Sequence, residues 1–334
     1  MPLYRVYSQY LKEKYGEKVY KLPLSLPCTC PNRDGTLSDK GCIFCGEKGT
    51  GFEMYHHSVP LRRQIEQNRE RIGKGYGAKK FIAYFQNYTN TYLPVNELKG
   101  YIRTVLEYDD IVEICLSTRP DCINDAYLQL FEAYSKQVHF SLELGLQSVN
   151  YRTLRNINRG HTLAEFLDAV LKIKQYHFPV TAHVILNLPW DDTEDAVECA
   201  KILSALRVDM VKLHSLYILK ESELGRQFER GEITLISKEE YIERVITFLR
   251  FLSPDIVIQR LLARAPEGDA LFCNWDTSWW KIKDEIELRM KENNFCQGDQ
   301  CNYLDGSALK KITYAQMSPA VSAAGSISDF QRGS

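Results

Sequence analysis

The sequence predicts an α/β fold in which a parallel sheet is covered by helices and followed by a C-terminal extension. The main observation is an alternation, repeated about six times, of short β-branched runs with longer segments of helical periodicity. Strand–helix units of this length require a parallel sheet, because the connecting helix packs back onto it. The composition agrees, since 44% of the 334 residues are hydrophobic and 25% are charged, which excludes a disordered or fibrous chain.

The individual elements follow from these patterns. Strands are expected at residues 19–24, 80–85, 111–116, 138–144, 180–186 and 210–216, with a further short strand at 256–259. Helices are expected at residues 60–72, 95–107, 126–135, 163–175, 193–205 and 238–252. Within the second of these helices, Leu98, Ile102 and Val105 have the spacing of one buried helix face. About six strand–helix units suit an open, partial (β/α)6 barrel better than a flat, doubly wound sheet.

The C-terminal part of the chain differs from the repeating units. We expect the barrel to occupy residues 1–265 and a helical extension, with an amphipathic helix at 279–294, to occupy residues 266–301. Residues 302–334 are rich in Ser, Ala and Gly over much of their length and have no periodicity, which predicts a low-complexity tail.

The charge balance and the sequence of the chain restrict its partners. Lys and Arg number 42 against 43 Asp and Glu, so the net charge is −1, and a nucleic-acid partner would need a local basic patch. No stretch approaches the roughly 20 apolar residues of a membrane span, so we expect no membrane partner. The first residues lack the pattern of a signal peptide. These features predict a cytoplasmic protein, whose thiols stay reduced.

The cysteines indicate a metal site. There are ten in the chain, and four of them, Cys28, Cys30, Cys42 and Cys45, lie close together near the N-terminus. In a reducing compartment such a group favours a metal site over disulfides. Three thiolates could hold three irons of a [4Fe–4S] cluster, whereas a structural zinc site needs four ligands, with Cys28 as the fourth. Cys28 and Cys30 are two residues apart, which leaves little room for both to hold one ion.

Several motifs, in the same order, resemble those of a known family. They comprise the run Cys30-Pro31-Asn32-Arg33-Asp34-Gly35 with Gly41-Cys42 and Cys45, the run 83–92, Ser117-Thr118-Arg119-Pro120-Asp121, 142–148, Asn158-Arg159-Gly160-His161-Thr162, 183–189 and 211–214. At these motifs the chain resembles radical SAM proteins of the YtqA/YhcC type, whose first two cluster cysteines are separated by eleven residues. The resemblance covers roughly residues 4 to 300, and Cys28 is extra relative to the family pattern.

The resemblance implies a TIM-like radical SAM partial barrel and its two cofactors. Cys30, Cys42 and Cys45 would hold a [4Fe–4S] cluster, and the enzyme would reductively cleave S-adenosylmethionine to a 5′-deoxyadenosyl radical. The S-adenosylmethionine contacts implied are Gln86, Asn87, Ser117, Glu143, Gln147, Arg159 and His183. Gln147 and the Arg twelve residues later reproduce a spacing found in coproporphyrinogen-oxidase-like relatives. A carboxylate inside a barrel, such as Glu143, needs ligand hydroxyls or a basic neighbour as partners. No residue is assigned a catalytic role.

A basic segment between residues 61 and 80 is a candidate nucleic-acid site. Its cations are Arg62, Arg63, Arg69, Arg71, Lys74, Lys79 and Lys80, against the acids Glu66 and Glu70. Helical spacing places Arg62 and Arg69 on one face, where they could contact phosphates. An ordinary solvated helix face is the alternative.

The substrate is suggested by the resemblance alone. Proteins of the YtqA type are associated with converting carboxymethylaminomethyluridine to aminomethyluridine at the tRNA wobble position, so the resemblance implies a tRNA substrate and an electron donor such as flavodoxin or ferredoxin. Two alternatives remain open. One is a radical SAM enzyme acting on a small metabolite or a protein side chain, and the other is a non-catalytic, zinc-stabilised RNA-binding protein.

Overall fold

The fold is built on one curled parallel sheet. The computed structural model describes residues 2–46, 54–264 and 268–311. Neighbouring strands follow the order β1-β2-β3-β4-β5-β6-β8, and all of these pairs are parallel. The strands are β1 (Val19–Leu24), β2 (Lys80–Phe85), β3 (Ile111–Thr118), β4 (His139–Gln147), β5 (Val180–Ile185), β6 (Met210–His214) and β8 (Val257–Arg260). The expected partial barrel is therefore confirmed, with the short strand at its end as the seventh.

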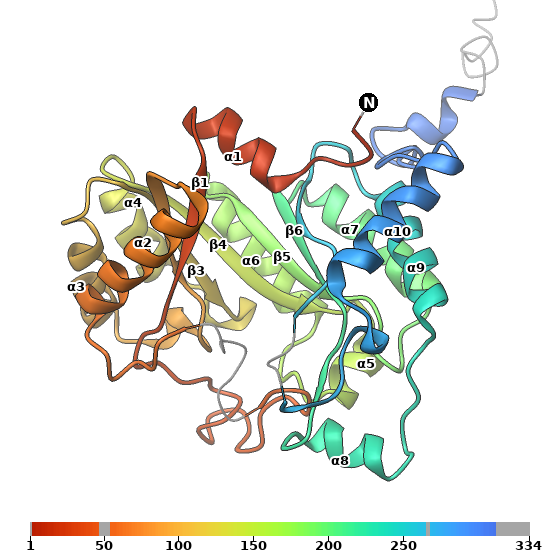
Figure 1. Ribbon diagram of the computed structural model, residues 1–334, viewed down its shortest axis with the longest axis horizontal. Helices are drawn as coiled ribbons and strands as arrows, with labels where there is room; N and C mark the ends of the chain where they lie inside the picture. The colour runs from red at the N-terminus through yellow and green to blue at the C-terminus, as the bar shows by residue number, and fades with distance from the viewer. Residues whose placement is uncertain (1, 47–53, 265–267, 312–334) are drawn as a thin grey trace, which may run out of the picture.

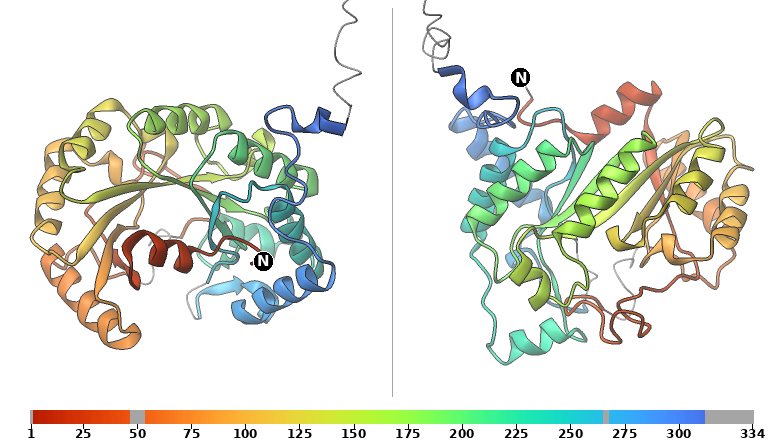
Figure 2. Two further views of the ribbon diagram at one scale, coloured as in Figure 1. Left: turned by 90° about the horizontal axis from the view of Figure 1, so that it is seen from above. Right: turned by 180° about the vertical axis from the view of Figure 1, so that it is seen from behind.

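Helices cover the outer side of this sheet. They are α2 (Leu61–Tyr76), α3 (Val95–Val105), α4 (Asp125–Tyr134), α6 (Leu163–Gln175), α7 (Thr193–Ala205) and α9 (Lys238–Phe251). Seen from above, they follow the convex side of the curled sheet, and its concave side is left for the site (Figure 2). Leu98, Ile102 and Val105 on α3 are completely buried, as their spacing predicts.

Capping residues fix where several of these helices begin. Thr162, Asp192 and Ser237 each accept a hydrogen bond from the backbone of the first turn, and an acidic residue three positions later reaches back to the cap. Such capping boxes satisfy backbone N–H groups that have no partner within the helix. The loops before α6, α7 and α9 therefore end at defined positions.

The N-terminal segment and the described C-terminal elements lie side by side at the open side of the sheet (Figures 1 and 2). Val6 pairs with Ile258 of β8, and α1 (Tyr7–Tyr15) contacts both β1 and β8. In the C-terminal part, β9 (Ala270–Phe272) pairs with β7 (Ile218–Leu219), and α10 (Trp279–Glu292) packs on α9. The N-terminal segment thus lies between the first and last strands of the sheet.

The structure contains several short elements that the sequence patterns do not predict. They are α1, α5 (Tyr151–Asn156), α8 (Glu223–Glu229) and the β7–β9 pair. Of the expected tail, residues 302–311 are described and end in a short 3-10 helix at Ser307–Lys311, while residues 312–334 lie outside the described part. Within the described ranges, no helix has the length and apolar character needed to cross a membrane.

Candidate active site

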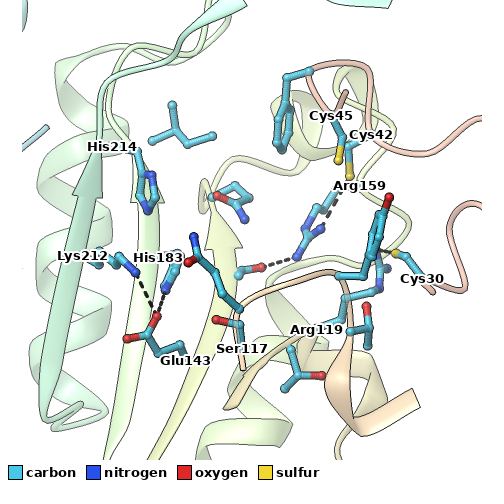
Figure 3. A pocket seen from close by; sticks show the side chains of 18 of the residues that line it. Cys30, Cys42, Cys45, Ser117, Arg119, Glu143, Arg159, His183, Lys212 and His214 are labelled. Carbon is cyan, nitrogen blue, oxygen red and sulfur yellow. Dashed lines mark hydrogen bonds and ion pairs between the residues drawn. The ribbon is translucent and has the colours of Figure 1, made fainter. Parts of the chain in front are cut away.

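A cavity of about 170 Å³ opens at the carboxyl ends of the strands. It is lined by residues of the loops that follow β1, β2, β3, β4, β6 and β8 and by residues within the strands themselves. Polar residues dominate the lining, as in Figure 3. They include Cys30, Arg33, Cys42, Cys45, Tyr84, Gln86, Ser117, Arg119, Glu143, Gln147, Arg159, His183, Lys212, His214, Arg260 and Arg264. In a barrel of parallel strands, this end is where catalytic sites are built.

Three cysteines line one side of the cavity, and each has an arginine beside it. Arg119 Nη1 lies 3.9 Å from Cys30 Sγ. Arg159 Nη1 lies 3.5 Å from Cys42 Sγ, and Arg33 Nη1 lies 3.5 Å from Cys45 Sγ. Burial raises the pKa of Cys45 to about 11, and Arg33 opposes that shift. A guanidinium beside a thiol favours the thiolate, which is the form that binds metals.

Cys28 is placed differently from the other three cysteines. It is not part of the cavity lining. Its thiol lies 3.4 Å from the Asn87 carbonyl oxygen and 3.7 Å from Asn90 Oδ1, and burial raises its pKa to about 12. The cavity therefore presents three thiols, as a [4Fe–4S] cluster with one open iron requires, rather than the four of a structural zinc site.

The turn before α6 holds the cysteine loop in place. Asn158 Nδ2 donates to the Gly41 carbonyl oxygen at 2.7 Å. Arg159 also donates to the Gly145 carbonyl oxygen at 2.8 Å. A Cβ on Gly145 would lie 2.5 Å from the Arg159 guanidinium, and Gly160 has a φ of +78° with Asn32 Oδ1 2.6 Å from the place of a Cβ. Both glycines are thus needed for the close approach of side chains around Arg159.

Glu143 is the centre of a buried ion network on the floor of the cavity. Its carboxylate accepts hydrogen bonds from Lys21, from Lys212 Nζ at 3.1 Å and from Tyr84 Oη at 2.6 Å, and it lies 2.7 Å from His183 Nε2. Lys21 and Lys212 hold the pKa of Glu143 well below its usual range despite its burial. The sequence predicts either ligand hydroxyls or a basic neighbour as the partner of this buried carboxylate, and the structure shows basic neighbours.

The bases around Glu143 have lowered pKa values. Burial lowers the pKa of Lys212 to about 8 although Glu143 opposes the shift. Burial and Lys212 together lower the pKa of His183 to about 4. Burial and Arg260 hold the pKa of His214 well below its usual range. Both imidazoles are therefore neutral at pH 7, and the positive charge on this floor comes from lysine and arginine.

Most of the residues expected to contact S-adenosylmethionine converge on the cavity. Its lining includes Gln86, Ser117, Glu143, Gln147, Arg159 and His183. Ser117 Oγ donates to Tyr84 Oη at 3.0 Å. Gln147 has a φ of +74° at a register shift where β4 pairs with β5, which turns the strand end at the cavity mouth. Their expected contacts with the cofactor stay predictions.

Asn87 is the exception among these residues, because its side chain does not line the cavity. Its Oδ1 accepts from the Leu26 amide at 3.0 Å, and its Nδ2 donates to the Leu26 carbonyl oxygen at 2.7 Å. The amide is thus used to hold the start of the cysteine loop. The Asn87 side chain therefore positions the loop, and the expected contact of Asn87 with the cofactor stays a prediction.

Most of the basic segment lies on α2 (Figure 1), and none of its residues lines the cavity. Arg62 forms an ion pair with Glu107, and Arg69 forms one with Asp110, whose Oδ2 lies 2.9 Å from Arg69 Nε. The two arginines do share one face of the helix, as expected, but both have acidic partners there. Contact with phosphates stays a prediction and would require these ion pairs to open.

Several lining residues, among them Tyr84, Arg260 and Arg264, were not expected as site residues from the sequence. Lys212 and His214 could be expected to face the site, because they are polar residues two positions apart in an otherwise apolar strand. Arg260 carries no such signal, since it stands at the end of the shortest strand of the sheet, where a polar residue is ordinary.

The side chains that line the cavity fit the two cofactors that the sequence suggests, a [4Fe–4S] cluster and S-adenosylmethionine. Three thiols face one cavity, and no fourth sulfur from the described part of the chain joins them. Among the described residues, Arg159 Nε is buried and has no hydrogen-bond partner, which leaves a donor for an anionic group such as the carboxylate of S-adenosylmethionine. Gln86 and Gln147 add amide groups at the mouth of the same cavity.

Several known proteins are similar to this chain in sequence or in structure. YtqA of Bacillus subtilis is 32% identical over 295 residues, which cover 88% of this chain and 92% of YtqA. A tRNA uridine(34) acetyltransferase of Methanocaldococcus jannaschii is 28% identical over 147 residues, 43% of this chain and 26% of that protein. The structure of Methanocaldococcus infernus Elp3 with an N-terminal deletion has a TM-score of 0.63 at 17% identity and covers 84% of this chain and 64% of that one.

Two family models account for most of the chain. The Radical SAM superfamily matches residues 30–202, a range that begins at the first cysteine of the cavity. The Radical_SAM C-terminal domain matches residues 208–292, which include β6, β8 and α10. The chain therefore belongs to the radical SAM superfamily, whose enzymes use a [4Fe–4S] cluster and S-adenosylmethionine.

Proposed function

We propose that this radical SAM enzyme remodels the side chain of a tRNA wobble uridine, converting carboxymethylaminomethyluridine to aminomethyluridine. The observation that carries the proposal is the similarity, over 147 residues, to a protein named tRNA uridine(34) acetyltransferase. The resemblance to the YtqA type, carried by the motifs quoted in the sequence analysis, implies the same substrate. A wobble base can enter a cavity in a half-barrel only if it leaves the anticodon stack, which single-stranded loops permit.

The residues of the cavity divide into two groups in this proposal. Cys30, Cys42 and Cys45 hold the cluster, and Arg159 with Gln147 binds S-adenosylmethionine next to it. Together these cofactors supply radical chemistry that removes a hydrogen atom from an unactivated carbon. Glu143 and His183, on the floor of the same cavity, contribute further contacts to S-adenosylmethionine. The protein thus contributes position and exclusion of water.

The same proposal includes a cytoplasmic location and an external electron donor such as flavodoxin or ferredoxin. All ten cysteines are free thiols, which suits a reducing compartment. Flavodoxin and ferredoxin are the donors expected for a low-potential cluster.

Nucleoside analysis of total tRNA tests the substrate. A strain without the gene should accumulate carboxymethylaminomethyluridine and lose aminomethyluridine, measured by liquid chromatography with mass spectrometry. The wild-type gene should restore the profile, and the Cys42→Ala variant should not, because Cys42 lies on the cavity beside Arg159. An unchanged profile in the strain without the gene would refute the tRNA assignment and point to a metabolite or protein substrate.

Anaerobic purification separates this proposal from a zinc-stabilised RNA-binding protein. We expect a brown protein with charge-transfer absorbance and about four irons per chain, since three thiols face the cavity. A colourless protein with one zinc per chain would overturn the radical assignment of the site.

A further inference from the structure

Two tryptophans at the start of α10 are exposed to solvent. Trp279 and Trp280 keep 36% and 49% of their surface accessible, whereas the other two tryptophans of the chain pack against apolar clusters. A cation lies over each exposed ring, with Arg264 Cζ 4.6 Å from the centre of Trp279 and Lys281 Nζ 5.5 Å from that of Trp280. Adjacent exposed rings of this size are typical of a surface that meets a partner.

Arg264 connects the Trp279 ring to the cavity. Its side chain both lines the cavity and lies over the Trp279 ring. The same lining includes the aromatic rings of Phe44, Tyr88 and Tyr217. Trp279 therefore lies at the rim of the cavity that, in the proposed function, receives the wobble base.

A strained turn before α10 fixes this arrangement. All three residues of the turn Asn274–Asp276 have a φ between +49° and +52°, a region that is unfavourable for residues other than glycine. Asn274 Oδ1 accepts from Ser215 Oγ at 2.5 Å, and Asn274 Nδ2 donates to the Ala263 carbonyl oxygen at 3.0 Å. Ser215 lines the cavity, so the turn and the backbone next to Arg264 are both tied to its wall. Strain of this kind persists only where the surroundings hold it, and it gathers at functional sites.

Extrusion of a wobble base creates a need for a stacking surface at this rim. In the proposed function the base leaves the anticodon stack to enter the cavity, so its neighbours lose a stacking partner. Aromatic rings and guanidinium planes are the surfaces on which unpaired RNA bases stack. Trp279 and Arg264 offer one of each, side by side.

We propose that Trp279, with Arg264, stacks against the base of a nucleotide that neighbours the wobble uridine in the anticodon loop. The inference rests on the proposed function and deepens it, because it names a part of the tRNA that is held outside the cavity. A protein partner would not explain why the exposed ring is joined to the cavity through Arg264. Since every base has a π-face, we expect the contact to raise affinity with little dependence on which base is present.

An anticodon stem-loop RNA tests this subsite. A fluorescein-labelled stem-loop with carboxymethylaminomethyluridine at the wobble position is titrated by anisotropy with the anaerobic holoenzyme, in the presence of S-adenosylmethionine and without reductant. Trp279→Ala should weaken binding roughly 5- to 100-fold, the range for one base stacked on an aromatic ring, and Trp279→Phe should retain most of the affinity. Trp280→Ala is the matched control and should change the affinity by less than about twofold, because Lys281, the cation over Trp280, does not line the cavity.

Stem-loops that lack one base separate stacking from an indirect effect. The base is removed on the 5′ or on the 3′ side of the wobble residue. One of these two RNAs should bind the wild-type protein about as weakly as the intact RNA binds Trp279→Ala. With that RNA, Trp279→Ala should cause no further loss, because both changes remove the same contact. Equal binding of all three RNAs by the wild-type protein, or independent losses for both abasic RNAs, would overturn the stacking site.

The tRNA profile keeps this inference distinguishable from the proposed function. The stacking site fails if the wild-type protein does not bind the stem-loop, or if Trp279→Ala with a native circular-dichroism spectrum binds it as the wild type does. It also fails if Trp280→Ala weakens binding as much as Trp279→Ala. The wobble substrate survives these results as long as loss of the gene changes the nucleosides of tRNA. If Trp279→Ala shows the coupled loss but the nucleosides are unchanged, the wobble chemistry fails and the stacking site stands.

Discussion

Each cysteine that lines the cavity has an arginine within 3.9 Å of its sulfur. These arginines come from separate parts of the chain: Arg33 from the cysteine loop, Arg119 from the end of β3 and Arg159 from the turn before α6. Their positive charge favours thiolates in a buried setting that otherwise raises thiol pKa values. Hydrogen bonds to cluster sulfurs are also among the factors that set reduction potential, so these arginines belong to the cluster site.

The four neighbouring cysteines should respond differently to substitution. Cys30→Ala, Cys42→Ala and Cys45→Ala should each lose the cluster and reductive cleavage of S-adenosylmethionine, because one iron loses its protein ligand. Cys28→Ala is the matched control and should keep both, since its thiol is directed to Asn87 and Asn90. Iron content and 5′-deoxyadenosine formation measure the difference. A dead Cys28→Ala protein beside an active Cys30→Ala protein would reverse the ligand assignment.

At the scale of elements, strand ends position the site and helix α2 lies outside it. The end of β4 bears Gly145 and Gln147 on either side of a register shift, and this bend lets Arg159 reach the Gly145 carbonyl oxygen. On α2, by contrast, Arg62 and Arg69 are tied to the loop before β3 through Glu107 and Asp110. The helix packs on β1, so a tRNA could contact only its outward face.

A double substitution on α2 tests whether that face binds tRNA. If Arg62 and Arg69 bind phosphates, Arg62→Gln with Arg69→Gln should weaken tRNA binding and lower the salt slope by about 0.7–0.9 for each phosphate that is no longer neutralised. Arg63→Gln with Arg71→Gln, further round the helix, is the comparison pair and should have the smaller effect. Cleavage of S-adenosylmethionine without tRNA should not change, because no residue of α2 lines the cavity. An unchanged affinity and slope would leave α2 an ordinary solvated helix.

At the scale of the whole molecule, the open sheet needs its two ends to be held. The N-terminal segment and the turn after α10 meet next to β8 around Gln297. Its Oε1 accepts from the Arg5 amide at 2.9 Å, and its Nε2 donates to the carbonyl oxygens of Ser253 at 2.7 Å and Ile256 at 2.8 Å. The side chain is buried, so these backbone groups depend on it for their hydrogen bonds.

Gln297→Ala should therefore lower the free energy of unfolding by about 2–4 kcal/mol, since buried backbone groups lose their partners. Asn293→Ala, an exposed change that removes a bond to Arg289 in the same helix, should cost less than about 1 kcal/mol. Urea unfolding of both variants under anaerobic conditions measures the difference. Equal stabilities would show that the chain ends are held by apolar packing alone.

The sequence by itself determined the parallel sheet, its six main strands, the outer helices and the three cysteines. These features depend on local information: hydrophobic periodicity within a segment and motifs whose residues are close together. Glu143 could likewise be expected to face the cavity, because it lies two positions before Gly145 and four before Gln147 in one strand, and side chains two apart in a strand share one side. The short elements α1, α5 and α8 and the β7–β9 pair lack enough periodicity to be found in this way.

Only the tertiary structure decided which groups meet on the cavity floor. Lys21 reaches Glu143 across 122 positions and Gln259 across 238 positions of sequence, and Arg260 meets His214 across 46. These contacts exist because the sheet curls, so that β1 and β8 face the same interior as β4 and β6. The path of the cysteine loop likewise places the Leu26 backbone where the Asn87 side-chain amide forms two hydrogen bonds with it. Sheet curvature and loop path arise from packing along the whole chain, so no local pattern of residues contains them.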